Sequence, residues 1–384
     1  MINVAIVGAG AISSFHIEGY AAFPGRCRIV SVVDVDRERA ERQIARYGLD
    51  AIAADDLELG QVDLASVCTP PGTHAGITER LLSAGVHTLC EKPMAPSLAE
   101  CDAMLAAERS GGAILSVVAQ NRFTNPMSKL KRLLDSGLAG QVRHAQVDSH
   151  WWRGPSYYDL WWRGTWESEG GGCTLNHAVH HIDALRWLVG SPAQVQAFFA
   201  NVAHDNAEVE DLSLAILRFG SGALGQLTSS VVHHAQDQKV VFQTDRASVA
   251  MPWAVSASRQ LPNGFPERDE QTERELSEYY ESLPGLRYEG HTGQIDDVLT
   301  AIETGGRVLI DGEQGRGTVE IITAIYESAI THELVRLPLD DADPFRSRQG
   351  LLAVAPRFHD KRVSVTEFAA NEITTTGGQT GAQR

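Results

Sequence analysis

Short apolar runs alternate with charged, helix-like stretches along the first part of the chain. Five of the apolar runs have the length and composition of buried strands: Ile2–Val7, Arg28–Val33, Val62–Cys68, His87–Cys90 and Ala113–Val118. The helix-like stretches between them are Arg37–Tyr47, Thr73–Ala84 and Ser97–Arg109. This alternation predicts a parallel sheet that helices cover on both faces.

The pattern changes near Asn125 and predicts a second architecture. After a helix at Pro126–Leu134, strand-like runs follow at Val142–Trp151, Gln194–Val202, Leu212–Phe219, Leu224–Val232 and Lys239–Met251. Most of these runs are neighbours in sequence, which favours a mixed or antiparallel sheet. Three further segments complete the chain: an acidic, poorly periodic surface excursion at Gln260–Arg287, and helices at Gly293–Thr304 and Gly315–Leu334.

The predicted fold class is α/β, with an N-terminal doubly wound (Rossmann) parallel sheet and a C-terminal α+β domain built on a large, open, mostly antiparallel sheet. At 384 residues the chain exceeds the size of one growing hydrophobic core. We therefore expect a nucleotide-binding domain at residues 1–123 and a substrate-binding and oligomerisation domain at residues 124–340. Residues 341–384 form an extension, and its tail beyond about Phe368 is expected to be disordered.

Composition narrows the possible partners. No apolar run approaches the roughly 20 residues of a membrane span, and a strand that begins at Ile2 leaves no room for a signal peptide, so we expect a cytoplasmic protein. The five cysteines form no CxxC pair and are expected to be reduced. The net charge of −16 argues against nucleic acid and anionic membranes as partners, although a local positive site can still hold an anionic substrate.

The first strand runs into a glycine turn that is typical of dinucleotide sites. Gly8 permits the tight turn and Gly10 lets backbone approach the pyrophosphate, while Ala11 and Ile12 open the following helix, whose amides would bind the anion. Ser13 occupies the place of the usual third glycine.

Asp34 ends the second strand, where a carboxylate accepts hydrogen bonds from the adenosine ribose. A carboxylate there favours NAD over NADP. Arg37 lies close enough in sequence to reach a 2′-phosphate, so NADP stays open as a second cofactor.

Lys92 follows a predicted strand and should project from the carboxyl edge of the sheet, where such folds bind ligands. A lysine there can hold a substrate hydroxyl and stabilise an alkoxide, or it can be a surface residue paired with Glu91. His74, beyond the third strand, either borders the cofactor or caps a helix.

A glycine-rich segment, GGGCTLNHAVHHID, opens the region Gly170–Gly190. Asn176 and His180 are four residues apart, which places them on one face of a helix, and His180 has the pKa range of a general base. His177 and His181 share the spacing of a zinc pair, but no third ligand is evident, so no metal is predicted.

Aromatic residues and arginines crowd the segment ahead of these glycines. They comprise Trp151, Trp152, Arg153, Tyr157, Tyr158, Trp161, Trp162, Arg163 and Trp166. Aromatic faces stack on sugar rings, but such residues also form cores and subunit interfaces, and both interpretations stay open.

Together these motifs resemble the glucose-fructose oxidoreductase and inositol dehydrogenase (Gfo/Idh/MocA) family over Met1 to about Leu339. The matching elements are VGAGAI with His16, Asp34, TPPGTH at Thr69–His74, AGVHTLCEKP ending at Pro93, NRF at Asn121–Phe123, GGGCTLNHAVHHID and AIYESA at Ala324–Ala329. The resemblance implies oxidation or reduction of a carbinol on a sugar or polyol with bound nicotinamide. It also implies that the open sheet face mediates homodimers or homotetramers.

The candidate site follows from the motifs and the resemblance. Lys92 would contact the reacting oxygen and His180 would exchange its proton, with Asn176 as the third catalytic candidate. The candidate cofactor contacts are Gly8, Gly10, Ala11, Ile12, Asp34, Thr69, Pro70, His74, Glu91 and Lys92. The candidate substrate contacts are Arg122, Tyr158, Arg163, Trp166 and His177.

One departure bears on mechanism, because many inositol dehydrogenase relatives carry aspartate where Asn176 stands. An amide cannot stabilise an imidazolium by charge, so His180 would be a weaker base or Lys92 would share the proton. The leading hypothesis is an NAD-dependent sugar or cyclitol dehydrogenase. The alternatives are a glycosidase that uses NAD in transient oxidation and elimination, and a non-catalytic sugar-sensing regulator.

Overall fold

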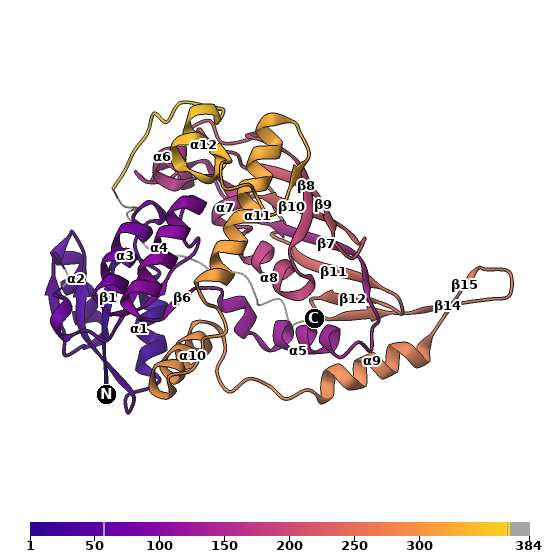
Figure 1. Ribbon diagram of the computed structural model, residues 1–384, viewed down its shortest axis with the longest axis horizontal. Coiled ribbons are helices and arrows are strands. Elements are labelled where there is room, and N and C mark those ends of the chain that lie inside the picture. The colour runs from indigo at the N-terminus through magenta and orange to yellow at the C-terminus, as the bar shows by residue number, and fades with distance from the viewer. Residues whose placement is uncertain (57, 367, 369–384) are drawn as a thin grey trace.

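A computed structural model describes residues 1–56, 58–366 and 368 (Figure 1). The tail expected to be disordered lies outside the described residues. Two sheets divide this part of the chain, and helices lie between them and around the first sheet. The fold class predicted from the sequence is confirmed.

The first sheet is parallel throughout and has the strand order β3-β2-β1-β4-β5-β6, the doubly wound arrangement of dinucleotide-binding folds. Its strands are β1 (Ile2–Val7), β2 (Cys27–Val33), β3 (Ile52–Ala54), β4 (Leu64–Val67), β5 (His87–Cys90) and β6 (Leu115–Val117). Its helices are α1 (Ser13–Ala21), α2 (Arg37–Tyr47), α3 (His74–Ser83) and α4 (Leu98–Gly111). The three-residue strand β3 was too short to predict from its pattern.

The second sheet is mixed, with the order β13-β12-β11-β7-β10-β9-β8-β16. Its strands are β7 (Val142–His150), β8 (Pro192–Ala200), β9 (Leu212–Phe219), β10 (Leu224–Ser230), β11 (Gln238–Thr244), β12 (Ser248–Met251), β13 (Ala254–Ser256) and β16 (Val335–Arg336). Only β7 and β10 pair in parallel; the other neighbours among the described strands are antiparallel.

Two predictions for this half were wrong in detail. The run Lys239–Met251 is two strands joined by a tight turn, where the Thr244 amide donates to the Ala247 carbonyl oxygen at 2.8 Å. The supposed excursion at Gln260–Arg287 contains the ribbon β14 (Ser258–Gln260) and β15 (Pro266–Arg268), which projects from the body, followed by helix α9 (Glu270–Ser282). The Asp269 side chain caps this helix by accepting from the Thr272 amide.

The remaining helices follow the first sheet along the chain. They are α5 (Asn125–Asp135), α6 (Trp166–Glu169), α7 (Cys173–Asn176), α8 (Val179–Val189), α10 (Gly290–Thr304), α11 (Gly312–Thr331) and α12 (Arg348–Val354). Helix α10 packs on α1, and its Ile295, Val298 and Leu299 share one core with β1 (Figure 1). The sequence-based boundary placed this helix in the second domain, yet its packing lies with the first.

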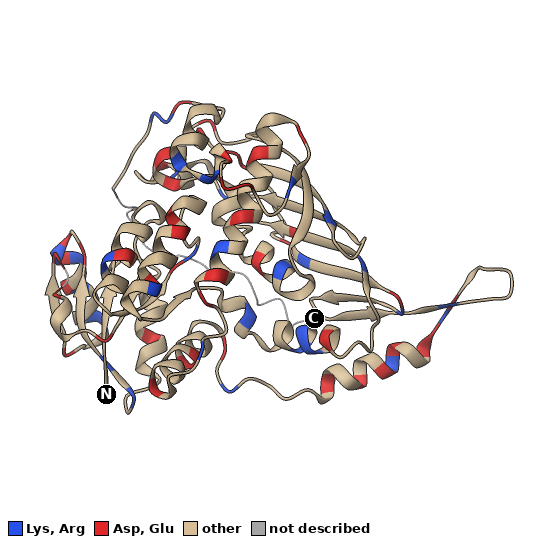
Figure 2. Ribbon diagram, viewed as in Figure 1, with Lys and Arg blue, Asp and Glu red and all other residues tan. Residues whose placement is uncertain are grey.

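Charge is dispersed over both halves. In Figure 2 acidic and basic positions occur on the helices of each domain, and acidic positions predominate along α9. Among the described residues, no helix combines the length and the apolar character that crossing a membrane requires.

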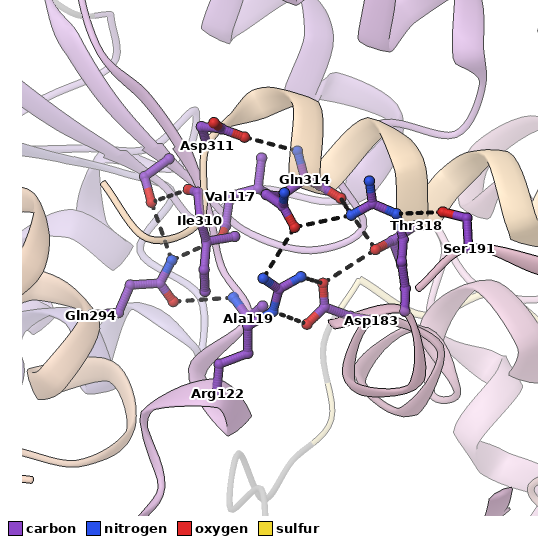
Figure 3. Close-up of polar contacts among 12 residues, drawn as sticks. Val117, Ala119, Arg122, Asp183, Ser191, Gln294, Ile310, Asp311, Gln314 and Thr318 are labelled. Atoms are coloured by element: carbon purple, nitrogen blue, oxygen red, sulfur yellow. Dashed lines mark hydrogen bonds and ion pairs between the residues drawn. The ribbon is translucent and has the colours of Figure 1, made fainter. Parts of the chain in front are cut away.

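A buried polar network joins the two halves (Figure 3). Arg122, in the short helix Gln120–Phe123 after β6, donates from Nε and Nη2 to the Asp183 carboxylate of α8 at 2.8 and 2.6 Å. Gln314 of α11 accepts from Arg122 and Arg186. Nearby, the Gln294 side chain of α10 accepts from the Ala119 amide and donates to the Val117 carbonyl oxygen.

We expect Arg122→Met to lower the free energy of unfolding by about 3–5 kcal/mol, because it leaves the Asp183 carboxylate buried without its charge partner. Urea denaturation measures the change. The exposed pair Arg259–Glu267 provides the matched control, and Glu267→Gln should change stability by less than about 1 kcal/mol. Equal losses in the two variants would contradict the importance of the buried pair.

Candidate functional site

The glycine turn has the shape and donors that a pyrophosphate needs. Gly8 adopts a φ of +97°, and a Cβ there would lie 2.7 Å from the Cys68 carbonyl, so the close approach of two strand ends requires glycine. A Cβ on Gly10 would meet no atom within 4 Å, so chain packing does not require this glycine. In the described part of the chain, the amides of Ala11 and Ile12 have no hydrogen-bond acceptor. Open space beside unpaired donors at the start of α1 fits a dinucleotide phosphate.

Asp34 ends β2 beside this turn, as predicted. One carboxylate oxygen accepts from the Ala9 amide at 2.8 Å and the other from the Asp36 amide at 2.9 Å. The arginine beside it is Arg39, at 3.4 Å. Arg37, which the sequence suggested for this place, instead pairs with Glu41 on the exposed face of α2.

Lys92 leaves the carboxyl end of β5 and reaches the second domain. Its Nζ donates to the Asn176 backbone carbonyl oxygen at 3.2 Å, so the interpretation as a surface lysine paired with Glu91 is wrong. Burial lowers the pKa of Lys92. The Glu91 carboxylate opposes this shift, and the nearby guanidinium groups of Arg163 and Arg153 add to it, so the pKa stays below its usual value. The site therefore holds an ammonium that releases its proton more readily than usual.

The helix expected to carry both Asn176 and His180 is interrupted between them. Helix α7 ends at Asn176 and α8 begins at Val179, with a turn at 177–178, so the one-face argument does not hold. The Asn176 side chain donates to the Gly171 carbonyl oxygen at 2.9 Å. Asn176 thus fixes its own turn with its amide and contacts Lys92 with its backbone.

His180 lies in the first turn of α8, in the electrostatic range of Lys92. Burial lowers the pKa of His180 well below 6.5, and the Lys92 ammonium lowers it further. The imidazole is therefore neutral near pH 7 and available as a base. The Lys92 ammonium of the first domain thus acts electrostatically on the His180 imidazole of the second.

Glu91 points inward, away from the role predicted for it. His16 Nε2 donates to its carboxylate at 3.0 Å, and His291 Nε2 lies 3.5 Å from the same oxygen. Burial alone would raise the pKa of Glu91, but these histidines hold it well below its usual value. The chain of contacts continues from His16 Nδ1 to the Ser66 hydroxyl at 3.0 Å.

His74 acts as a clamp between two loops. It is buried, and its ring nitrogens lie 2.8 Å from the Pro93 and Thr69 carbonyl oxygens. Both partners are acceptors, so the imidazolium satisfies both. Burial opposes this charge, but the contacts with Cys90 and the two carbonyls outweigh it and raise the pKa of His74 to about 9. The clamp holds the Thr69–Pro70 segment, a predicted cofactor contact, against the loop that carries Lys92.

The aromatic and arginine segment divides into two groups. Arg163 lies between the rings of Tyr157 and Trp162, with its guanidinium carbon 4.1 and 4.0 Å from their centroids. His177 Nε2 lies 3.2 Å from the Tyr157 hydroxyl. Arg163 lowers the pKa of Lys92, and Lys92 lowers that of His177, so both lie within the electrostatic range of Lys92, and their role as substrate contacts stays a prediction.

Three other substrate candidates are buried. Arg122 donates to Asp183, and the Trp166 indole donates to the Pro356 carbonyl oxygen at 2.7 Å. Tyr158 is only 1% exposed, and its hydroxyl has no hydrogen-bond partner in the described chain. Arg122 and Trp166 therefore serve internal contacts, whereas a substrate role for Tyr158 stays a prediction.

Sequence reasoning missed several groups near the site. Arg153 appeared only as part of the aromatic segment, and Glu169 and His291 carried no signal at all. His291 lies on α10, about 200 residues after Lys92 in the sequence. Among the described residues, the group of possible metal ligands is His16, Glu91 and His291, not the His177 and His181 pair that the spacing suggested.

Comparison with known proteins agrees with this geometry. Residues 2–119 match the family profile described as an oxidoreductase family with an NAD-binding Rossmann fold, and residues 127–250 match the GFO/IDH/MocA C-terminal domain. This chain belongs to the Gfo/Idh/MocA oxidoreductase family. The resemblance stated from the sequence is confirmed, as is an NAD-binding first domain.

Relatives cover nearly the whole chain. Inositol 2-dehydrogenase of Rhizobium meliloti is 25% identical over 335 residues, which are 85% of this chain and 96% of its own. Levoglucosan dehydrogenase of Pseudarthrobacter phenanthrenivorans is 24% identical, and the match covers 88% of this chain and 98% of that protein. The crystal structure of the WlbA dehydrogenase from Bordetella pertussis, in complex with NADH and UDP-GlcNAcA, is 28% identical with a TM-score of 0.75 and covers 88% of this chain and 99% of its own.

The clamp predicts a pH dependence of stability. Because the pKa of His74 rises from 6.5 to about 9 on folding, its contribution is complete below pH 6.5 and disappears as pH rises to about 9. That contribution is on the order of 3 kcal/mol. The stability difference between the wild type and His74→Gln, from urea denaturation, should shrink across this window. His359→Gln, at a partly exposed position, is the control. A constant difference from pH 6 to pH 9 would show that His74 does not titrate there.

Proposed function

We propose that the protein is an NAD-dependent dehydrogenase that acts on a secondary alcohol of a sugar, cyclitol or related polyol. The observation that carries the proposal is the contact of Lys92, at the carboxyl edge of the nucleotide-binding sheet, with the Asn176 carbonyl oxygen of the second domain, four residues before His180. The Lys92 charge also acts on the His180 ring. Open α/β sheets bind their ligands at this edge. The names of the relatives, which are dehydrogenases of inositol and levoglucosan, support this substrate class.

Two side chains divide the chemistry. The Lys92 ammonium donates a hydrogen bond to the alcohol oxygen and stabilises the negative charge that develops there. The neutral His180 imidazole accepts the hydroxyl proton. Bound NAD supplies the hydride acceptor. Asn176 positions the ammonium through its backbone carbonyl, and the Glu91 network holds the neighbouring backbone because Glu91 accepts from the Lys92 amide at 3.1 Å.

The turn and Asp34 favour NAD over NADP. The Asp34 carboxylate would repel a 2′-phosphate, although Arg39 beside it offsets part of that charge. We propose NAD as the working cofactor and NADP as a weaker substitute.

An exposed apolar face supports a homodimer or homotetramer. Phe198 of β8, Leu214 and Ile216 of β9 and Leu224 of β10 are between 46% and 64% exposed on the outer face of the second sheet. A patch of this kind on one sheet marks a protein interface. The five buried, unpaired cysteines suit a reducing compartment, so we propose the cytoplasm.

Lys92→Ala and His180→Ala should each lower kcat/KM by about 10²–10⁴-fold, because each removes a group that acts on the alcohol oxygen. NADH formation with inositols and aldoses measures the loss, and NAD affinity by calorimetry should change little. Glycoside cleavage without accumulation of NADH would instead select the NAD-dependent glycosidase. NAD binding with no turnover of any polyol would select the sensing regulator.

The pH profile of kcat/KM should be bell-shaped, and both limbs should lie at lower pH than the usual pKa values of histidine and lysine would give. His180 must be neutral, so activity falls on the acid side only below pH 6.5, where its lowered pKa lies. Lys92 must be charged, so activity falls on the basic side before pH 10.5. Lys92→Arg should move the basic limb upward, since guanidinium keeps its proton. An unmoved limb would remove Lys92 from the proton balance.

A further inference from the structure

The site collects more positive charge than alcohol oxidation needs. Lys92, Arg153 and Arg163 all act on the ring of His177 and, together with His180, lower its pKa well below 6.5 after the effect of burial. We call Lys92, Arg153 and Arg163, together with the neutral ring of His177 on which they act, the cationic cluster. Its positive charge stands out because the whole chain carries a net charge of −16, with acidic positions on both halves (Figure 2).

Most of this charge has only neutral partners in the described chain. Lys92 Nζ donates to the Asn176 carbonyl oxygen, and Arg153 Nη1 donates to the Trp152 carbonyl oxygen at 2.7 Å and to the Gln236 amide oxygen at 3.4 Å. The nearby Glu91 carboxylate is occupied by His16 and His291. A backbone carbonyl orients a cation without cancelling its charge.

Within the described part of the chain, Glu169 is the carboxylate that forms an ion pair with an arginine of the cluster. It accepts from Arg163 at 2.8 Å and from the Gly164 amide at 2.6 Å. Burial raises the pKa of Glu169 to about 7, although Arg163 opposes the rise. At neutral pH this carboxyl group is only partly ionised, so it balances Arg163 incompletely.

Two buried donors or acceptors in the cluster have no partner. Arg163 Nε and His177 Nδ1 lie out of contact with water and hydrogen-bond to no described atom, and His177 as a whole is only 7% exposed. Unpaired buried polar atoms cost stability unless a ligand uses them. Aromatic rings hold the arginines in place: Arg163 lies between Tyr157 and Trp162, and Arg153 lies 5.4 Å from the Trp151 ring centroid.

We propose that the cationic cluster binds a carboxylate carried by the substrate, so that the preferred substrate is an acidic polyol such as a uronic or aldonic acid. The inference rests on the proposed function and specifies its substrate. Lys92 contacts the reacting oxygen in the proposed function. Arg153, and Arg163 whose charge Glu169 neutralises only in part, then remain to bind one negative charge on the substrate. Planar guanidinium groups match the planar carboxylate, and Glu169 would repel a phosphate dianion more strongly.

The test compares matched substrates that differ in one group. NADH formation is measured with D-glucuronate, D-glucose and D-glucose 6-phosphate, and with the corresponding galactose series. We expect kcat/KM for the uronate to exceed that for the neutral sugar at least tenfold and to fall with added salt. Equal or better use of the neutral sugars would overturn the proposal, and preference for the phosphates would replace the carboxylate with a phosphoryl group.

Variants locate the effect. Arg153→Met and Arg163→Met should each reduce the uronate preference about tenfold or more while turnover of neutral sugars changes less. Arg357→Met, at a residue whose side chain is 69% exposed, is the control and should keep the preference. If Arg163→Met does not fold, the partly exposed Arg153 alone decides the outcome.

A binding measurement separates this inference from the proposed function. Should no alcohol give NADH, the dehydrogenase proposal fails, and thermal shifts with glucuronate and glucose in the presence of NAD still test the cluster. Stabilisation by glucuronate that Arg153→Met abolishes would keep the carboxylate site. The same shift from glucose, or none from either sugar, would remove it.

Discussion

The buried ion pair between Arg122 and Asp183 is the constraint on which the site depends. Its carboxylate lies on α8, three residues beyond His180, and its guanidinium follows the last strand of the sheet that carries Lys92. Lys92 and His180, the two groups proposed to react, come from separate domains, so their separation depends on the contacts that fix α8 against the first sheet. An apolar contact would hold the halves together without fixing one arrangement. A two-pronged bond to a planar carboxylate, with Gln314 beside it, specifies both distance and rotation.

Much of the fold followed from periodicity, because parallel strands buried on both faces read as continuous apolar runs. The failures share a cause in local turn chemistry and length. Strand β3 is three residues long, too short for any period to emerge, and the turn inside Lys239–Met251 contains no glycine or proline to announce it. Helix α9 has an amphipathic pattern, but it was not predicted because the segment around it contains prolines and the irregular sequence of the projecting ribbon.

Only part of the candidate site could be predicted from the sequence. Gly8, Asp34, Lys92 and His180 could be predicted because dinucleotide binding and alcohol oxidation need these residue types at strand ends and helix starts, and the structure places them at such positions. Arg122 and Trp166 were expected at the substrate but contact internal groups, because a sequence tells neither which way a side chain points nor which group accepts its hydrogen bonds. The break after Asn176 and the arrival of His291 on α10 depend on tertiary packing, for which one sequence offers no signal.

The return of α10 to the first domain has a consequence for biosynthesis. Ile295, Val298 and Leu299 complete the core that contains β1 and α1, so a nascent chain emerging from the ribosome cannot close its amino-terminal half until nearly three hundred residues have been made. The intervening sheet is synthesised in the meantime. Domains usually mature in order of synthesis. Here the core of the first domain needs residues of α10, which are synthesised after the second sheet. A continuous fragment of the first domain alone would therefore lack part of its own core.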